Sequence, residues 1–156
     1  MRAAARGFTL IELMVTLAIL AVLASVVVPS AQLGVQRMRE TELKRALREI
    51  RDGIDAYKAA YEAGHIERRQ DGNGYPPDLA TLVDGVNDQL DPEGRRRYFL
   101  RRIPSDPFCQ QAEPERCWGL RSYASPADAP RSGEDVYDVY SLATGVGLNG
   151  IAYRNW

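Results

Sequence analysis

A single carboxylate, Glu12, interrupts an apolar stretch close to the N-terminus. It is the only charged side chain between Phe8 and Ser30. An acidic group in the hydrocarbon of a membrane costs roughly 2.5 to 3.5 kcal/mol, so Glu12 requires a positive partner at the same depth. If the chain were cut after Gly7, the new amino group of Phe8 would supply that charge, within one helix or from a neighbouring copy.

The element that must hold Glu12 is a membrane-spanning helix over residues 8–30, because one crossing needs about 20 mainly apolar residues. Arg2 and Arg6 precede this stretch, and the positive-inside rule predicts a cytoplasmic N-terminus and an extracytoplasmic chain beyond Ser30. An ordinary signal peptide has a shorter apolar core. A plain single-pass anchor leaves Glu12 unexplained, and a buried core helix needs a second apolar layer that the sequence does not offer.

The N-terminal motif resembles that of a known family. After the short basic leader, the residues read Gly7-Phe8-Thr9-Leu10-Ile11-Glu12-Leu13. This order resembles the class III signal of type IV pilins and of the pseudopilins of type II secretion. The resemblance implies that residues 1–7 are a leader peptide, that a membrane peptidase cuts between Gly7 and Phe8 and methylates the Phe8 amine, and that Glu12 serves filament assembly.

The helix is expected to continue beyond the membrane over residues 31–64. A proline inside a helix removes a hydrogen bond and bends the axis, so Pro29 predicts a helix kink. Gly64 is typical of a helix end. Apolar residues spaced three and four apart form one stripe, which we interpret as core contact: Leu43, Leu47, Ile50, Ile54, Tyr57 and Tyr61. The apolar residues among 33–38 share no such face and are expected to contact neighbouring subunits.

Residues 65–156 are expected to form an extracytoplasmic globular head. Asp78 predicts the cap of a short helix that ends near Gly85. Three segments separated by links rich in Pro, Asp and Gly are predicted strands: 118–124, 136–142 and 150–156. An antiparallel sheet packed on the helical stripe would bury both apolar surfaces, so the expected fold class is α+β.

The head resembles that of the G-type pseudopilins, which form the main subunit of the type II secretion filament. The resemblance rests on the order of these motifs: Tyr75-Pro76, Ile103-Pro104-Ser105-Asp106-Pro107, Trp118-Gly119-Leu120-Arg121-Ser122-Tyr123, Tyr137-Asp138-Val139-Tyr140-Ser141 and Asn155-Trp156. With the leader, it implies a pilin-like fold in which a long N-terminal helix packs on a small head.

The same resemblance implies a single-pass protein of the bacterial inner membrane, with its head in the periplasm and a filament that drives protein export. The implied partners are other copies of the chain, minor pseudopilins, a prepilin peptidase and methyltransferase, and an inner-membrane assembly platform. Two alternatives stay open: a pilin of a type IV pilus, serving adhesion, twitching or DNA uptake, and a domain tethered by an uncleaved anchor.

Calcium is the cofactor that the resemblance implies, bound in the last loop by aspartates. Calcium takes six to eight oxygen ligands, usually with several carboxylates among them. Residues 142–156 contain no Asp or Glu. The candidates for a site are therefore Glu134, Asp135 and Asn149, and a glycine-rich turn without a cofactor is the alternative that we expect.

Cys109 and Cys117 are candidates for a disulfide, because an extracytoplasmic loop can oxidise. Closing so short a loop would stabilise the fold by about 2.5 kcal/mol on the chain-entropy model. Our hypothesis is that this bond takes the place of calcium in fixing the chain after Pro107. A metal site at these cysteines is disfavoured, because the chain has one histidine, His65, and no CxxC spacing.

Net charge and residue spacing do not indicate a nucleic-acid-binding protein or an enzyme, and the resemblance implies a structural subunit. The formal net charge of the 156-residue chain is -1, whereas a nucleic-acid surface needs a basic face. His65 lies in a polar segment, where a lone histidine is usually solvated. No nucleophile, base and orienting group can be proposed from spacing, so no catalytic residue is expected.

Overall fold

A computed structural model describes residues 7–68 and 72–156 of the chain. These residues form two compact units, divided between Met38 and Arg39, and the long helix α1 (Leu10–Glu62) contributes to both. Each unit is described by itself. The leader residues 1–6 lie outside the described part, so the expected boundaries of leader, membrane segment and head stay predictions.

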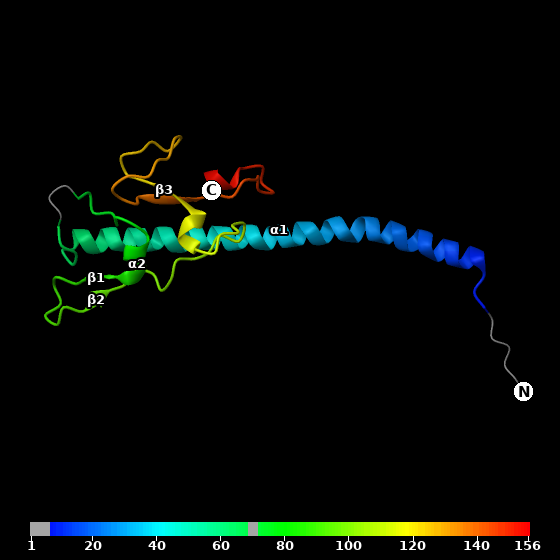
Figure 1. Ribbon diagram of the computed structural model, residues 1–156, viewed down its shortest axis with the longest axis horizontal. Coiled ribbons are helices and arrows are strands. Elements are labelled where there is room, and N and C mark those ends of the chain that lie inside the picture. The colour runs from blue at the N-terminus through cyan, green and yellow to red at the C-terminus, as the bar shows by residue number, and fades with distance from the viewer. Residues whose placement is uncertain (1–6, 69–71) are drawn as a thin grey trace, which may run out of the picture. The chain divides into compact units, whose positions relative to one another are not determined.

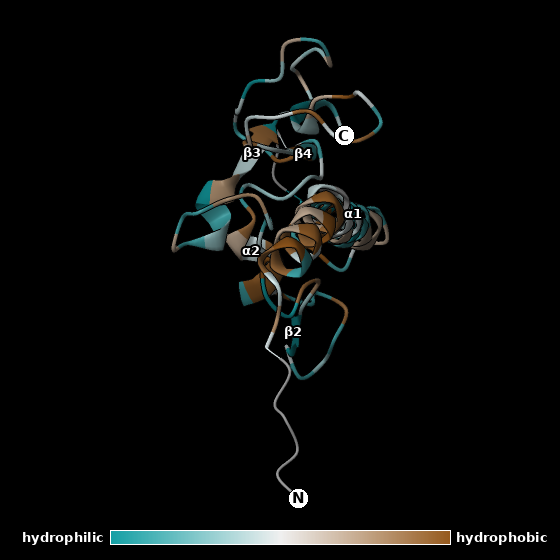
Figure 2. Cartoon of the chain, turned by 90° about the vertical axis from the view of Figure 1, so that its right-hand side faces the viewer, coloured by the Kyte–Doolittle hydropathy of each residue, from teal (hydrophilic) through white to brown (hydrophobic). Residues whose placement is uncertain are grey.

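Among the described residues, the first unit is mainly the N-terminal part of α1, and residues 13–25 of this helix carry mostly apolar side chains on every face. The brown colour in Figure 2 runs around its turns, and large apolar side chains from Leu10 to Met38 are exposed. Two hydroxyls in this part are satisfied inside the helix, since Thr16 donates to the carbonyl of Leu13 at 2.9 Å and Ser25 to that of Val22 at 2.7 Å. The helical backbone continues through Pro29. Its side chain is outside the described ones, and the kink stays a prediction.

The second unit has its core along α1. The predicted stripe is buried from Leu43 to Tyr57, with Tyr61 partly buried, so its interpretation as core is confirmed. The stripe is covered by apolar residues from the whole head: Leu79, Leu82, Leu100, Ile103, Trp118, Val136, Val139 and Tyr153. The helix ends at Glu62, and Gly64 adopts a φ of 83°, as expected of a helix stop.

Short elements surround this core (Figure 1). Helix α2 (Ala80–Asp84) begins where Asp78 accepts a hydrogen bond from the Thr81 amide at 2.7 Å, and it ends at Gly85, so both predictions are confirmed. The antiparallel strands β1 (Val86–Asn87) and β2 (Arg96–Arg97) follow, a hairpin that the sequence did not predict. The 3₁₀ helix η1 (Pro114–Cys117) leads into the main strands.

Strands β3 (Trp118–Arg121) and β4 (Asp138–Ser141) pair antiparallel, with Trp118 opposite Ser141. The third predicted strand, 150–156, is wrong. This segment forms one bridge, between Val146 and Ala152, and then the 3₁₀ helix η2 (Tyr153–Asn155). The reason is that its main chain bonds to the preceding glycine-rich loop, since the Tyr153 amide donates to the carbonyl of Gly145 at 3.2 Å. The α+β, pilin-like fold class is confirmed.

Candidate functional site

The junction between Gly7 and Phe8 lies just before α1 in a non-helical segment. The Phe8 side chain is 78 % exposed, and nothing lies within 4 Å of the point where a side chain on Gly7 would begin. A peptide bond in such a segment is accessible to a processing enzyme. Arg2 and Arg6 of the basic leader lie outside the described residues.

Glu12 lies in the first turn of α1, where the structure gives its neighbour Thr9 a role that the sequence reasoning missed. The Thr9 hydroxyl oxygen accepts a hydrogen bond from the Glu12 amide at 3.3 Å and caps the helix. The pattern Thr-x-x-Glu is typical of a capping box, and could have indicated this. A carboxylate in the first turn also interacts favourably with the helix dipole. The helix end therefore offsets part of the cost of placing Glu12 beside apolar residues.

The helix that carries Glu12 is long and apolar enough to cross a membrane, and none of its most apolar window is buried within the described chain. A helix that is hydrophobic on all sides needs lipid or neighbouring helices around it. The apolar residues Leu33, Val35 and Met38 are also exposed. Their expected contact with neighbouring subunits stays a prediction.

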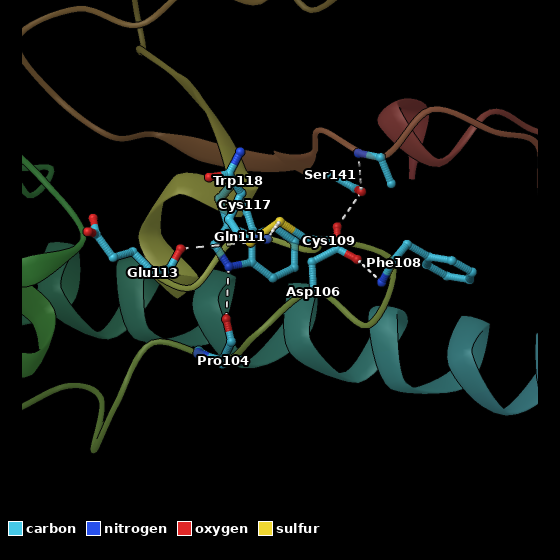
Figure 3. The surroundings of a disulfide bond; sticks show 10 residues. Pro104, Asp106, Phe108, Cys109, Gln111, Glu113, Cys117, Trp118 and Ser141 are labelled. Atoms are coloured by element: carbon cyan, nitrogen blue, oxygen red, sulfur yellow. Dashed lines mark hydrogen bonds between the residues drawn. A yellow bond between two sulfur atoms is a disulfide. The ribbon is translucent and has the colours of Figure 1, made fainter.

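Cys109 and Cys117 are joined by a disulfide, with their Cα atoms 5.7 Å apart. Figure 3 shows the surrounding contacts: the indole N–H of Trp118 donates to the carbonyl of Pro104 at 2.9 Å, and the hydroxyl of Ser141 donates to Asp106. The bond thus lies beside a buried carboxylate that reaches the end of β4.

The calcium candidates do not fit a shared site. The carboxylate of Asp135 accepts hydrogen bonds from the side chains of Asn73 and Ser122 and from the Tyr123 amide, at 2.6 to 3.2 Å. The Asn149 side-chain oxygen accepts from Ile151 within its own turn at 3.0 Å, and Glu134 is exposed. Within residues 7–68 and 72–156, no three His, Cys, Asp or Glu side chains are grouped as metal ligands.

In the described part of the head, two groups have shifted pKa values. Hydrogen bonds from His65 and then from Arg97 lower the pKa of Asp88 far below its ordinary value. His65 is therefore bonded and not simply solvated, with its Nδ1 2.8 Å from Asp88 Oδ1. Burial, followed by the proximity of Tyr137, raises the pKa of Tyr75. The Asp88 cluster ties the segment just after α1 to the β1–β2 hairpin.

Comparison with known proteins identifies the N-terminal motif. Residues 2–28 match the family model of the prokaryotic N-terminal methylation motif. Together with a long N-terminal helix and a small antiparallel head, this match defines a pilin-like membrane-anchored protein. No solved structure gives a significant match to the chain.

Individual relatives define the family within this pilin-like class. The chain is similar to type II secretion system core protein G of Klebsiella pneumoniae, at 31 % identity over 107 residues, which are 66 % of this chain and 69 % of the relative. The protein of the same name from Dickeya chrysanthemi is 27 % identical over 152 residues, 93 % of this chain and 92 % of the relative. That from Pseudomonas aeruginosa is 29 % identical over 136 residues, 83 % and 88 % respectively.

The chain therefore belongs to the family of type II secretion system core protein G, the G-type pseudopilins. The alternative of a type IV pilus pilin is not favoured, because these relatives are core proteins of type II secretion.

Proposed function

We propose that this pseudopilin is inserted in the bacterial inner membrane with its head in the periplasm, cut after Gly7, methylated at Phe8 and assembled into a periplasmic filament that drives export. The filament subunits are copies of this chain, joined by minor pseudopilins. The prepilin peptidase and methyltransferase processes the chain, and an inner-membrane platform assembles it. The chain acts as a structural subunit without catalysis of its own.

One observation carries this proposal: Glu12 lies in the capped first turn of a helix whose apolar side chains are exposed. After a cut at Gly7, the amine of Phe8 would begin the chain one residue before the cap Thr9. In an assembled filament, the N-terminal helices would pack against one another outside the lipid. The Glu12 carboxylate of one copy would then pair with the Phe8 amine of a neighbour. Such a desolvated pair sets register, because leaving one partner alone in an apolar surrounding is costly.

The test compares three variants of the full chain in the host membrane. Glu12→Leu removes the charge, Glu12→Asp keeps it on a shorter side chain, and Thr9→Val removes the capping oxygen while leaving Glu12 in place. Filaments are scored by electron microscopy of sheared fractions, and processing by the intact mass of the membrane protein.

We expect Glu12→Leu to be inserted and cut but not assembled, Glu12→Asp to assemble in part, and Thr9→Val to assemble. The wild-type mass should correspond to a chain that begins at Phe8 and carries one methyl group. Normal filaments from Glu12→Leu would exclude the pairing. A wild-type chain that still begins at Met1 would indicate an uncleaved anchor.

A further inference from the structure

The glycine-rich loop at residues 143–150, between β4 and η2, is held by a carboxylate from outside the loop. The Leu148 amide donates to Glu40 Oε1 at 2.8 Å, and the Tyr153 hydroxyl donates to the same oxygen at 3.1 Å. Glu40 belongs to α1 and is 8 % exposed. A hydrogen bond to a charged acceptor stabilises a fold more than a neutral one does.

The start of the loop is held by a second buried carboxylate. The Ser141 hydroxyl donates to Asp106, and its oxygen accepts from the Ala143 amide at 3.0 Å. Asp106 also accepts from the Phe108 amide at 2.8 Å, just before the disulfide at Cys109 (Figure 3). Two carboxylates from outside the loop, Glu40 of α1 and Asp106 of the head, therefore hold it near its two ends.

The polarity of these contacts is opposite to that of a calcium site. A calcium ion collects oxygen lone pairs, so a loop must turn carbonyl and carboxylate oxygens toward it. Here the loop turns an N–H group, that of Leu148, toward a fixed negative charge. Its carbonyls at Gly145 and Gly147 accept hydrogen bonds from Tyr153 and Gly150 within the same segment.

We propose that Glu40 orders the C-terminal loop in place of a bound cation, so that the head of this chain folds without calcium. The proposal concerns the unassembled protein and is independent of the filament function. It makes Glu40 a loop-positioning residue, although the sequence places it among the charged residues of a helix.

The experiment uses the full chain, purified in detergent. Thermal unfolding is followed in millimolar CaCl₂ and in excess EGTA, for the wild type and for Glu40→Gln, Glu40→Ala and Glu42→Gln. Glu42 is the matched control, because it lies on the same helix and is exposed. Hydrogen exchange measured by mass spectrometry reports separately on the peptide that contains Leu148.

We expect the wild-type Tm to be the same in calcium and in EGTA. Glu40→Ala should lower it by roughly 5 to 10 °C, Glu40→Gln by less because an amide oxygen still accepts, and Glu42→Gln should leave it unchanged. Exchange at residues 143–150 should rise in both Glu40 variants, which separates local loosening from general destabilisation.

Two results would overturn the proposal. A wild-type Tm that rises with calcium and falls with EGTA would show a cation site, and loss of that response in Glu40→Ala would make Glu40 one of its ligands. Unchanged exchange of the loop in Glu40→Ala would show that Glu40 does not order it.

Discussion

Three carboxylates of this chain have different roles because their surroundings differ. Glu12 lies in the capped first turn of an exposed apolar helix. Glu40 is buried and accepts hydrogen bonds from a loop more than 100 residues away in sequence. Asp88 is held between His65 and Arg97. Residue type alone assigns none of these roles, since the groups around each carboxylate decide them.

The substitution Asp88→Asn tests how much Asp88 stabilises the head, through the pH dependence of unfolding. Asp88 has an ordinary pKa of 3.8, which its partners lower in the folded head. A lowered pKa means that the folded state binds the proton less readily than the unfolded state. The stability from Asp88 is therefore fully present above about pH 4 and is lost as the pH falls further.

We expect the difference in Tm between wild type and Asp88→Asn to be largest near neutral pH and to shrink below pH 3.8. Thermal unfolding of both proteins in a series of buffers measures it. A difference in Tm that stays constant down to pH 2 would mean that the contacts of Asp88 with His65 and Arg97 do not stabilise the folded head.

At the scale of elements, the head depends on loop contacts more than on strands. The paired strands β3 and β4 contain four residues each. Arg51 of α1 joins β4 to the C-terminus, since its Nε lies 2.8 Å from Asp138 Oδ1 and its Nη2 donates to the carbonyl of Trp156 at 2.9 Å. Short strands supply few ladder bonds, so side-chain contacts from the helix stabilise the sheet.

Removal of the disulfide between Cys109 and Cys117 tests how much this bond stabilises the folded head. The two residues are eight apart, and the chain-entropy model assigns so short a closure about 2.5 kcal/mol. We expect the double variant Cys109→Ser, Cys117→Ser to unfold at a lower temperature than the wild type in the absence of reductant.

Reductant supplies the control for this prediction. It should lower the wild-type Tm to that of the double variant and leave the variant unchanged. A wild-type Tm that does not respond to complete reduction would show that the bond contributes nothing to stability.

At the scale of the whole molecule, the two units differ in what they bury. The first unit exposes apolar side chains from Phe8 to Met38, whereas the second buries an apolar stripe of the same helix. An apolar helix surface of this length requires lipid or other helices. The first unit is therefore suited to a membrane or to contacts with other helices.

Deletion of the gene tests the function of the whole chain. We expect lost secretion of exoproteins with intact surface pili, because the family is that of a type II secretion core protein. A plasmid with the wild-type gene should restore secretion, and one with Glu12→Leu should not. Lost pili or twitching with normal secretion would instead assign the chain to a type IV pilus.

The sequence by itself determined the features that depend on local pattern. The motif from Gly7 to Leu13 indicated the family, the three-and-four spacing from Leu43 to Tyr57 indicated the buried face of α1, and Gly64 and Gly85 marked helix ends. These predictions succeeded because helix periodicity and turn chemistry act between near neighbours along the chain.

Only the tertiary structure decided how distant residues meet. The pattern of residues 150–156 predicted a strand, but their main chain bonds to the loop from Gly145 to Gly147. Glu40 and Arg51 belong to a charged helix sequence typical of a solvated face, yet both hold the C-terminal segment. A hydrogen bond across 100 residues depends on packing that no local spacing encodes, and for that reason these two roles were found only in the folded chain.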